Sequence, residues 1–140
     1  MEMQNTETKY SILIVDDDEE IRLGFHHLLS AKGFIVEVAA SGAQALRAYK
    51  DSGFDLVITD ILMPNEDGLS LIMQLRGYDK EVRIIAISGG GKKNNMGYLK
   101  LARSFGAITS LEKPVTSVKL LEAINEILGI GGIKNDQISI

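Results

Sequence analysis

Residues 12–18 read Ile-Leu-Ile-Val-Asp-Asp-Asp, so four aliphatic side chains run directly into three carboxylates. A continuous aliphatic run of this length is typical of a strand that is covered on both faces, as in the middle of a parallel sheet. Two later runs have the same character, Leu56-Val57-Ile58 and Ile84-Ile85-Ala86-Ile87. The three runs together predict the centre of a parallel sheet with helices on both faces.

Two further segments are predicted to be strands nearer the edges of this sheet. Segment 35–40 is interrupted by Glu37, and segment 107–111 carries Thr109 and Ser110, so both are more polar than the central runs. Five strands are therefore expected, the central three at 11–15, 55–59 and 83–87.

Helical patterns separate the expected strands. Apolar side chains recur at helical spacing in two sets, Ile21, Phe25, Leu28 and Leu29, and Tyr98, Leu101, Ala102 and Phe105. Ser41, with Gln44 three residues later, is a capping-box pattern that predicts a helix ending near Lys50. A last helix is expected at 118–128.

Three glycines stand where helices are expected to end, at Gly33, Gly53 and Gly106. Five strands alternating with five helices predict an α/β fold with a doubly wound sheet and right-handed crossovers. This domain covers residues 10–128. The polar segment 1–9 and the Gly-rich, polar tail 129–140 are too short for a second core, so no output domain is expected.

The composition excludes several classes of function. The chain has 140 residues, 45% of them hydrophobic, and no cysteine, which removes disulfides, thiolate zinc sites and cysteine nucleophiles. A net charge of -4 argues against direct DNA binding, because no basic surplus is present to neutralise phosphates. No apolar run approaches the ~20 residues of a membrane-spanning helix, and the N-terminus is unlike a secretory signal. We therefore expect no membrane insertion and a cytoplasmic location.

Polar residues follow four of the predicted strands. The first strand ends in Asp16-Asp17-Asp18 and the third in Asp60, Ser88 closes the fourth, and Lys113 comes soon after the fifth. The carboxyl ends of parallel strands meet at one edge of the sheet, where ligands of doubly wound folds bind. Clustered carboxylates favour a hard cation such as Mg²⁺, and a lysine and a hydroxyl beside it would hold a phosphoryl group.

Each of these residues also has a plainer explanation when taken alone. The acids at 16–20 are suited to cap a helix, and the adjacent His26 and His27 are expected on the surface of one, since no third metal ligand is in view. The segment Gly89–Asn95, with three glycines and two lysines, reads either as a long connection or as a cationic lid. It lacks the spacing of a phosphate-binding P-loop.

The whole set of residues resembles the receiver domains of two-component response regulators over about residues 10–128. The resemblance is carried by Ile12-Leu13-Ile14-Val15-Asp16-Asp17, Asp60-Ile61-Leu62-Met63-Pro64 with Asp67-Gly68, Ser88, Gly106-Ala107 and Lys113-Pro114. It implies a flavodoxin-like (βα)5 fold with strand order 2-1-3-4-5.

The resemblance also implies a role for each site residue. Asp60 would be the phosphoacceptor, taking its phosphoryl group from a phosphohistidine of a sensor histidine kinase or phosphotransfer protein. Asp17, Asp60 and the main-chain carbonyl of Leu62 would bind Mg²⁺, and Asp16 would hold a water on the metal. Lys113 would steady the phosphoryl group and Ser88 would be the switch hydroxyl.

Two features depart from the receiver pattern. Receivers usually carry Tyr or Phe three residues before the lysine, where this chain has Ser110, and the connection after Ser88 is longer than usual. We expect a signalling switch, not a metabolic enzyme, that acts in trans on a partner protein. The alternatives are a constitutive binding module whose output phosphorylation does not drive, and a phosphohydrolase of the haloacid dehalogenase type, whose DxDx[TV] signature is incomplete in residues 16–20.

Overall fold

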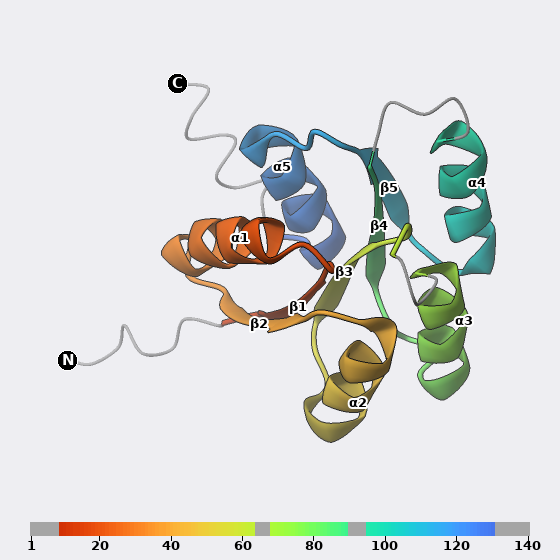
Figure 1. Ribbon diagram of the computed structural model, residues 1–140. Helices are drawn as coiled ribbons and strands as arrows, with labels where there is room; N and C mark the ends of the chain where they lie inside the picture. Colours follow the sequence, from red (N-terminus) through yellow and green to blue (C-terminus); the bar gives the residue numbers. More distant parts are fainter. Residues whose placement is uncertain (1–8, 64–67, 90–94, 131–140) are drawn as a thin grey trace.

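Five parallel strands form a single sheet in the order β2-β1-β3-β4-β5, which confirms the predicted doubly wound fold and strand order (Figure 1). The computed structural model describes residues 9–63, 68–89 and 95–130. The strands are β1 (Ser11–Val15), β2 (Ile35–Ala39), β3 (Leu56–Asp60), β4 (Ile84–Ser88) and β5 (Thr109–Glu112). The helices are α1 (Glu19–Ala31), α2 (Gly42–Ser52), α3 (Gly68–Tyr78), α4 (Asn95–Phe105) and α5 (Ser117–Leu128).

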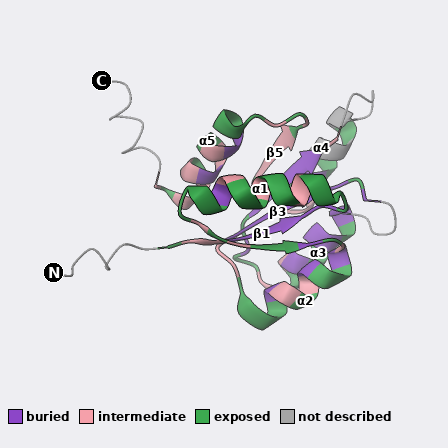
Figure 2. Cartoon of the chain, turned by 60° about the vertical axis from the view of Figure 1, so that its left-hand side comes forward, coloured by how far each residue is buried: buried purple, intermediate pink, exposed green. Residues whose placement is uncertain are grey.

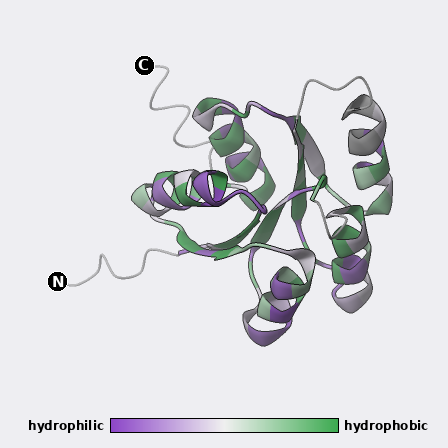
Figure 3. Ribbon diagram, viewed as in Figure 1, coloured by the Kyte–Doolittle hydropathy of each residue, from purple (hydrophilic) through white to green (hydrophobic). Residues whose placement is uncertain are grey.

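The three aliphatic runs occupy the centre of the sheet, as predicted. Every residue of β3 and β4 is buried, and so is β1 from Ile12 onward, whereas β2 and β5 at the edges are more exposed (Figure 2). Alternate side chains of a strand point to opposite faces, so each central strand supplies two separate cores. This burial on both faces explains why these runs are aliphatic throughout (Figure 3).

The helices divide between the two faces of the sheet. Leu13, Val57 and Ile84 pack in one core with buried residues of α2, α3 and α4. Ile12 and Ile58 pack in the other with Leu29 of α1 and with two residues of α5. Figure 1 shows α1 and α5 on one side and the other three helices opposite.

No helix in the described part of the chain combines the length and apolarity needed to cross a membrane.

The helix ends follow the predicted signals. Ser41 is the N-cap of α2, and its Oγ accepts a hydrogen bond from the Gln44 N–H at 3.1 Å. The Gln44 side chain reaches back to the N–H of Ala40, one residue before the position expected for a capping box. Gly33, Gly53 and Gly106 all have positive φ beyond the ends of α1, α2 and α4, as their placement predicted.

The bounds of β2 to β5 differ by one or two residues from the sequence prediction. β3 and β4 each lie one residue later than the predicted ranges 55–59 and 83–87, so Asp60 and Ser88 are paired residues at the ends of these strands. β5 begins at Thr109 instead of residue 107, because the N–H groups of Gly106 and Ala107 still bond to the carbonyl of Ala102 and finish the last turn of α4. The positions of Asp60 and Ser88 are therefore fixed by the sheet itself.

Candidate functional site

The carboxyl ends of β1 and β3 bring three aspartates together. Asp16 follows β1 directly and Asp60 is the last residue of β3, and these neighbouring strands pair up to Val15 and Thr59. Carboxylate oxygens of Asp16, Asp17 and Asp60 all lie within 4.8 Å of one another. Asp16 and Asp60 are 3% and 5% exposed, while Asp17 faces solvent. The cluster predicted from the strand ends is thus present, with two buried members and one accessible one.

Lys113 reaches the cluster from the end of β5, at the same carboxyl edge of the sheet. Its Nζ donates to Asp16 Oδ2 at 3.2 Å and to Asp60 Oδ2 at 3.5 Å. The backbone places it there, because the Lys113 N–H donates to the carbonyl of Ser88 at 2.8 Å and continues the pairing of β4 with β5. One ammonium therefore bridges the two buried carboxylates.

The acids after β1 separate into two groups. The Asp18 carboxylate accepts the N–H groups of Glu20 and Ile21, so Asp18 is the N-cap of α1. Asp16 Oδ1 accepts the Asp18 N–H, and its Oδ2 faces Lys113. The helix-capping explanation of this acidic run therefore applies to Asp18, whereas Asp16 and Asp17 belong to the cluster.

The remaining predicted residues lie at the same edge of the sheet. The Leu62 N–H donates to Asp60 Oδ1 at 3.1 Å, which lays the main chain of Leu62 against the carboxylate. Ser88 is completely buried at the end of β4, and its Oγ donates to the Gly89 carbonyl at 3.4 Å. His26 and His27 are exposed on α1, as predicted. Residues 90–94 of the Gly–Lys loop lie outside the described residues, as do Pro64 and Asp67 of the motif after Asp60.

The two principal charges of the site shift each other's protonation. Burial raises the pKa of the Asp60 carboxyl above its usual value; the Leu62 N–H and the Lys113 ammonium lower it only in part, and Asp16 raises it further. Burial lowers the pKa of Lys113, but the carboxylates of Asp60 and Asp16 outweigh that effect and raise it. Three carboxylates surround one ammonium in this cluster, so an excess of negative charge remains, which favours a cation.

Gly68 was noted in the sequence only as part of a motif, and the close packing that requires a glycine at this position was not predicted. A β-carbon at this position would lie 2.3 Å from the Asp60 carbonyl oxygen and 2.4 Å from the Ile61 Cα. The start of α3 thus packs directly on the backbone that carries Asp60, with the Gly68 N–H donating to the Ile61 carbonyl. The sequence shows only a glycine at the start of an expected helix, and that pattern does not identify the close approach of α3 to Asp60.

Comparison with known proteins agrees with this geometry. A model of the response regulator receiver domain family matches residues 12–125. Chemotaxis protein CheY of Bacillus subtilis (strain 168) is 37% identical over 120 residues, covering 85% of this chain and 98% of that protein. Sensor kinase CckA of Brucella abortus (strain 2308) is 31% identical over 120 residues, which are 84% of this chain and 12% of the kinase. The crystal structure of a CheY-like receiver domain protein from Methanospirillum hungatei JF-1 has a TM-score of 0.79 at 30% identity, over 87% of this chain and 95% of that one.

We predict that Asp60→Asn stabilises the metal-free protein at neutral pH. The raised pKa of Asp60 means that folding disfavours its charged form, whereas asparagine keeps an oxygen for the Leu62 N–H without the charge. The destabilisation by Asp60 is complete above its folded pKa and disappears as pH falls below its unfolded pKa. Thermal unfolding in chelator should show the advantage of the variant at about pH 7.5 and its loss near pH 4. An advantage that is unchanged at low pH would contradict this origin.

We predict that Gly68→Ala destabilises the protein by about 1–3 kcal/mol, because the new methyl group meets backbone that cannot move without displacing Asp60. Gly77→Ala is the matched control in the same helix, since a β-carbon there has nothing within 4 Å. That change should stabilise by roughly 0.5–1 kcal/mol through helix propensity. Chemical denaturation measures both variants, and equal effects would refute the packing argument.

Proposed function

Because this chain belongs to the response regulator receiver domain family, we propose that it is a signalling switch that accepts a phosphoryl group on Asp60. The observation that carries the proposal is the bridge of Lys113 between the buried carboxylates of Asp60 and Asp16, with Asp17 exposed beside them. Receiver domains are switches and not metabolic enzymes, and they interact with histidine kinases and downstream targets. The phosphodonor proposed here is a phosphohistidine on a sensor histidine kinase or phosphotransfer protein.

The two oxygens of Asp60 are suited to different tasks. Oδ1 accepts the Leu62 N–H, so Oδ2, on the Lys113 side, is the oxygen proposed to attack phosphorus. A new O–P bond forms as the N–P bond of the phosphohistidine breaks, and the imidazole leaves with the electron pair of that bond. Lys113 would then pair with a phosphoryl oxygen, and the buried hydroxyl of Ser88 would donate to another after rotating from Gly89.

Receiver domains bind Mg²⁺ in an acidic pocket, and the donor set present in this chain fits such an ion. Asp17, Asp60 and the Leu62 main-chain carbonyl are proposed to hold it, with Asp16 fixing a metal-bound water. When bound, the ion would offset the charge of the phosphoryl oxygens. The excess of negative charge that remains beside Lys113 supports this assignment.

An apolar groove beside Lys113 supports a protein as the phosphodonor. It has a volume of about 710 Å³ and lies between α1 and the start of α5, where Gly24, Phe25 and Leu28 face Pro114 and Val115. A helical segment lying in this groove would bring its phosphohistidine to the edge of the sheet next to Asp60.

The alternative of a phosphohydrolase is not supported, because the second acid of its signature would be Asp18, which caps α1.

The direct test is phosphorylation by a small phosphodonor. We expect acetyl phosphate with Mg²⁺ to add one phosphoryl group, seen as a single adduct by intact mass and mapped to Asp60. Chelation of Mg²⁺ should abolish the adduct, as should Asp60→Asn. An adduct that persists in Asp60→Asn, or no adduct in the wild type, would refute the proposal.

A second prediction tests protein docking separately from the chemistry. Gly24→Arg adds a long side chain to the apolar groove and should slow phosphotransfer from a histidine kinase by at least about tenfold, while leaving the rate with acetyl phosphate unchanged. Gly77→Arg is the control, since both glycines are helical and have open space around a β-carbon. Equal slowing by both variants, or slowing with both donors, would argue against docking at this groove.

A further inference from the structure

Arg22 lies near the start of α1, and its side chain reaches back to the end of β1. Its N–H donates to the Asp18 carbonyl at 3.0 Å as the helix begins, and the side chain is half-buried. One guanidinium nitrogen, Nη1, donates to the main-chain carbonyl of Asp16 at 2.9 Å. Long side chains on a helix point toward its N-terminus, which explains this direction. Arg22 therefore connects α1 to the backbone of the aspartate cluster.

The Asp16 carbonyl belongs to the peptide group that joins Asp16 to Asp17. The Asp16 N–H donates to the Ala39 carbonyl at 3.2 Å, and its Oδ1 accepts the Asp18 N–H at 2.9 Å. In the described part of the chain, the hydrogen bond that the Asp16 carbonyl accepts comes from Arg22. Because a peptide group is planar, a donor held on this carbonyl also fixes the plane from which Asp17 departs.

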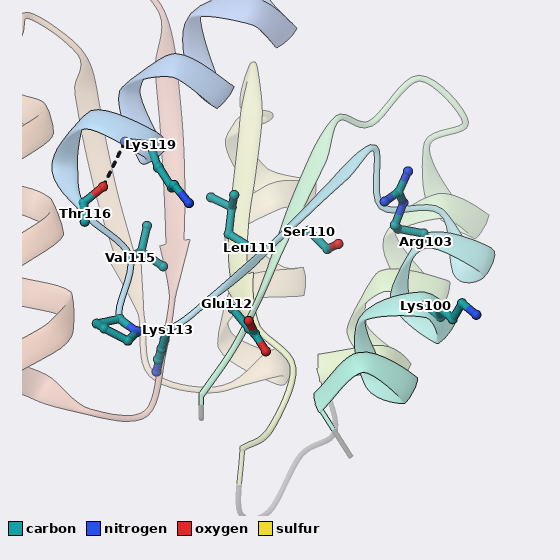
Figure 4. A pocket seen from close by; sticks show the side chains of 10 residues that line it. Lys100, Arg103, Ser110, Leu111, Glu112, Lys113, Val115, Thr116 and Lys119 are labelled. Atoms are coloured by element: carbon teal, nitrogen blue, oxygen red, sulfur yellow. Dashed lines mark hydrogen bonds between the residues drawn. The ribbon is translucent and has the colours of Figure 1, made fainter. Parts of the chain in front are cut away.

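Arg22 bonds to the main chain although carboxylates lie close by. Within the described residues it makes no ion pair. Lys113 differs, because its Nζ contacts carboxylate oxygens of Asp16 and Asp60 from the end of β5 (Figure 4). The guanidinium instead makes a charge-assisted hydrogen bond to a carbonyl, which is stronger than a bond between neutral groups. The Asp17 carboxylate therefore stays available to a cation.

The needs of the helix do not explain an arginine at this position. The N-terminal end of a helix carries a partial positive charge, which disfavours a cation near it. Glu19 and Glu20 in the first turn complement that charge, and Asp18 supplies the N-cap. The contact of Arg22 with the Asp16 carbonyl is thus the interaction that accounts for its place.

We infer that Arg22 is a positioning residue of the proposed Mg²⁺ site, which fixes the peptide group between Asp16 and Asp17 and thereby aims both carboxylates. The inference deepens the proposed function, and it rests on that proposal only for the presence of the cation site. Residues that orient the ligands of a metal change its affinity by about 10–100-fold when they are removed.

Positioning and simple electrostatics predict opposite results for Arg22→Met. The variant removes the guanidinium donors and one positive charge, and it keeps an unbranched side chain that suits a helix. Charge alone would strengthen cation binding, because a positive group beside the site is lost. Loss of positioning should instead weaken the binding of Mn²⁺ and Mg²⁺ by at least about tenfold. The paramagnetic resonance signal of free Mn²⁺, which prefers the same oxygen ligands, measures binding, and Mg²⁺ is added as the competitor.

Arg83→Met is the matched control, because Arg83 is exposed and precedes β4, at the opposite edge of the sheet. It removes the same charge and should leave the affinity within about twofold of the wild type. Asp17→Asn should abolish binding, which identifies the site that the titration measures. Circular dichroism confirms that each variant is folded at the temperature of the titration.

A second readout reports the peptide group itself. The amide nitrogen of Asp17 shares its peptide group with the Asp16 carbonyl, so its ¹⁵N resonance in the metal-free chain should shift in Arg22→Met. The shift in Arg83→Met should be much smaller. A purely structural role of Arg22 in α1 would lower the free energy of unfolding without changing the cation affinity.

Mn²⁺ binding by Arg22→Met that equals or exceeds the wild type would overturn the inference, as would an equal loss in both arginine variants or an unshifted Asp17 resonance. A wild type that binds neither ion would refute the proposed metal site, and the inference with it. The titration uses no phosphodonor, so failure of Asp60 phosphorylation leaves its result intact. Phosphorylation of Asp60 is likewise measured independently of Arg22.

Discussion

The contact between the Lys113 ammonium and the carboxylates of Asp16 and Asp60 is the interaction on which the site depends. Moving a carboxylate out of water costs on the order of several kcal/mol, and this fold buries two carboxylates side by side. Lys113 offsets part of that cost, but the pKa of Asp60 is still raised, so the compensation is incomplete. The fold thus gives up stability to keep the Asp60 carboxylate buried beside a second carboxylate, where a bound cation would offset the remaining negative charge.

The parallel sheet in this strand order brings these groups together at one edge. Asp16 and Asp60 follow adjacent strands, while Lys113 follows β5, two strands beyond β3. The lysine reaches them because its N–H extends the β4–β5 ladder at Ser88 and its long side chain passes the end of β4 near Gly89. A β-carbon on Gly89 would lie 3.5 Å from the Lys113 Cδ, so the Lys113 side chain passes close to the main chain of Gly89.

The sequence predicts the central strands well because strands that are buried on both faces consist of nearly continuous aliphatic residues. It also predicts that Asp16, Asp17, Asp60 and Lys113 meet, because parallel strands align their carboxyl ends. It does not separate Asp18 from its neighbours, since a capping aspartate and a clustered one have the same side chain and differ only in what each oxygen contacts. The requirement for Gly68 is likewise tertiary, because the atoms that a β-carbon there would meet belong to Asp60 at the end of β3 and to Ile61 after it. The late start of β5 depends on how α4 ends around Gly106, where Arg76 of α3 donates to the glycine carbonyl.

The serine at position 110 changes how a signal could leave the acidic cluster. An aromatic ring on β5 could report the state of the site by changing its rotamer, but Ser110 has no ring to move. A connection through the main chain is present among the described residues, since the Lys113 N–H donates to the Ser88 carbonyl and Glu112 pairs with Ser88 across the ladder. A phosphoryl group drawing on Lys113 and Ser88 would act on the end of this ladder, and Glu112 lies in a groove between α4 and α5. A displacement at this end of the ladder would therefore move the backbone and the charge of Glu112 without any change of an aromatic rotamer.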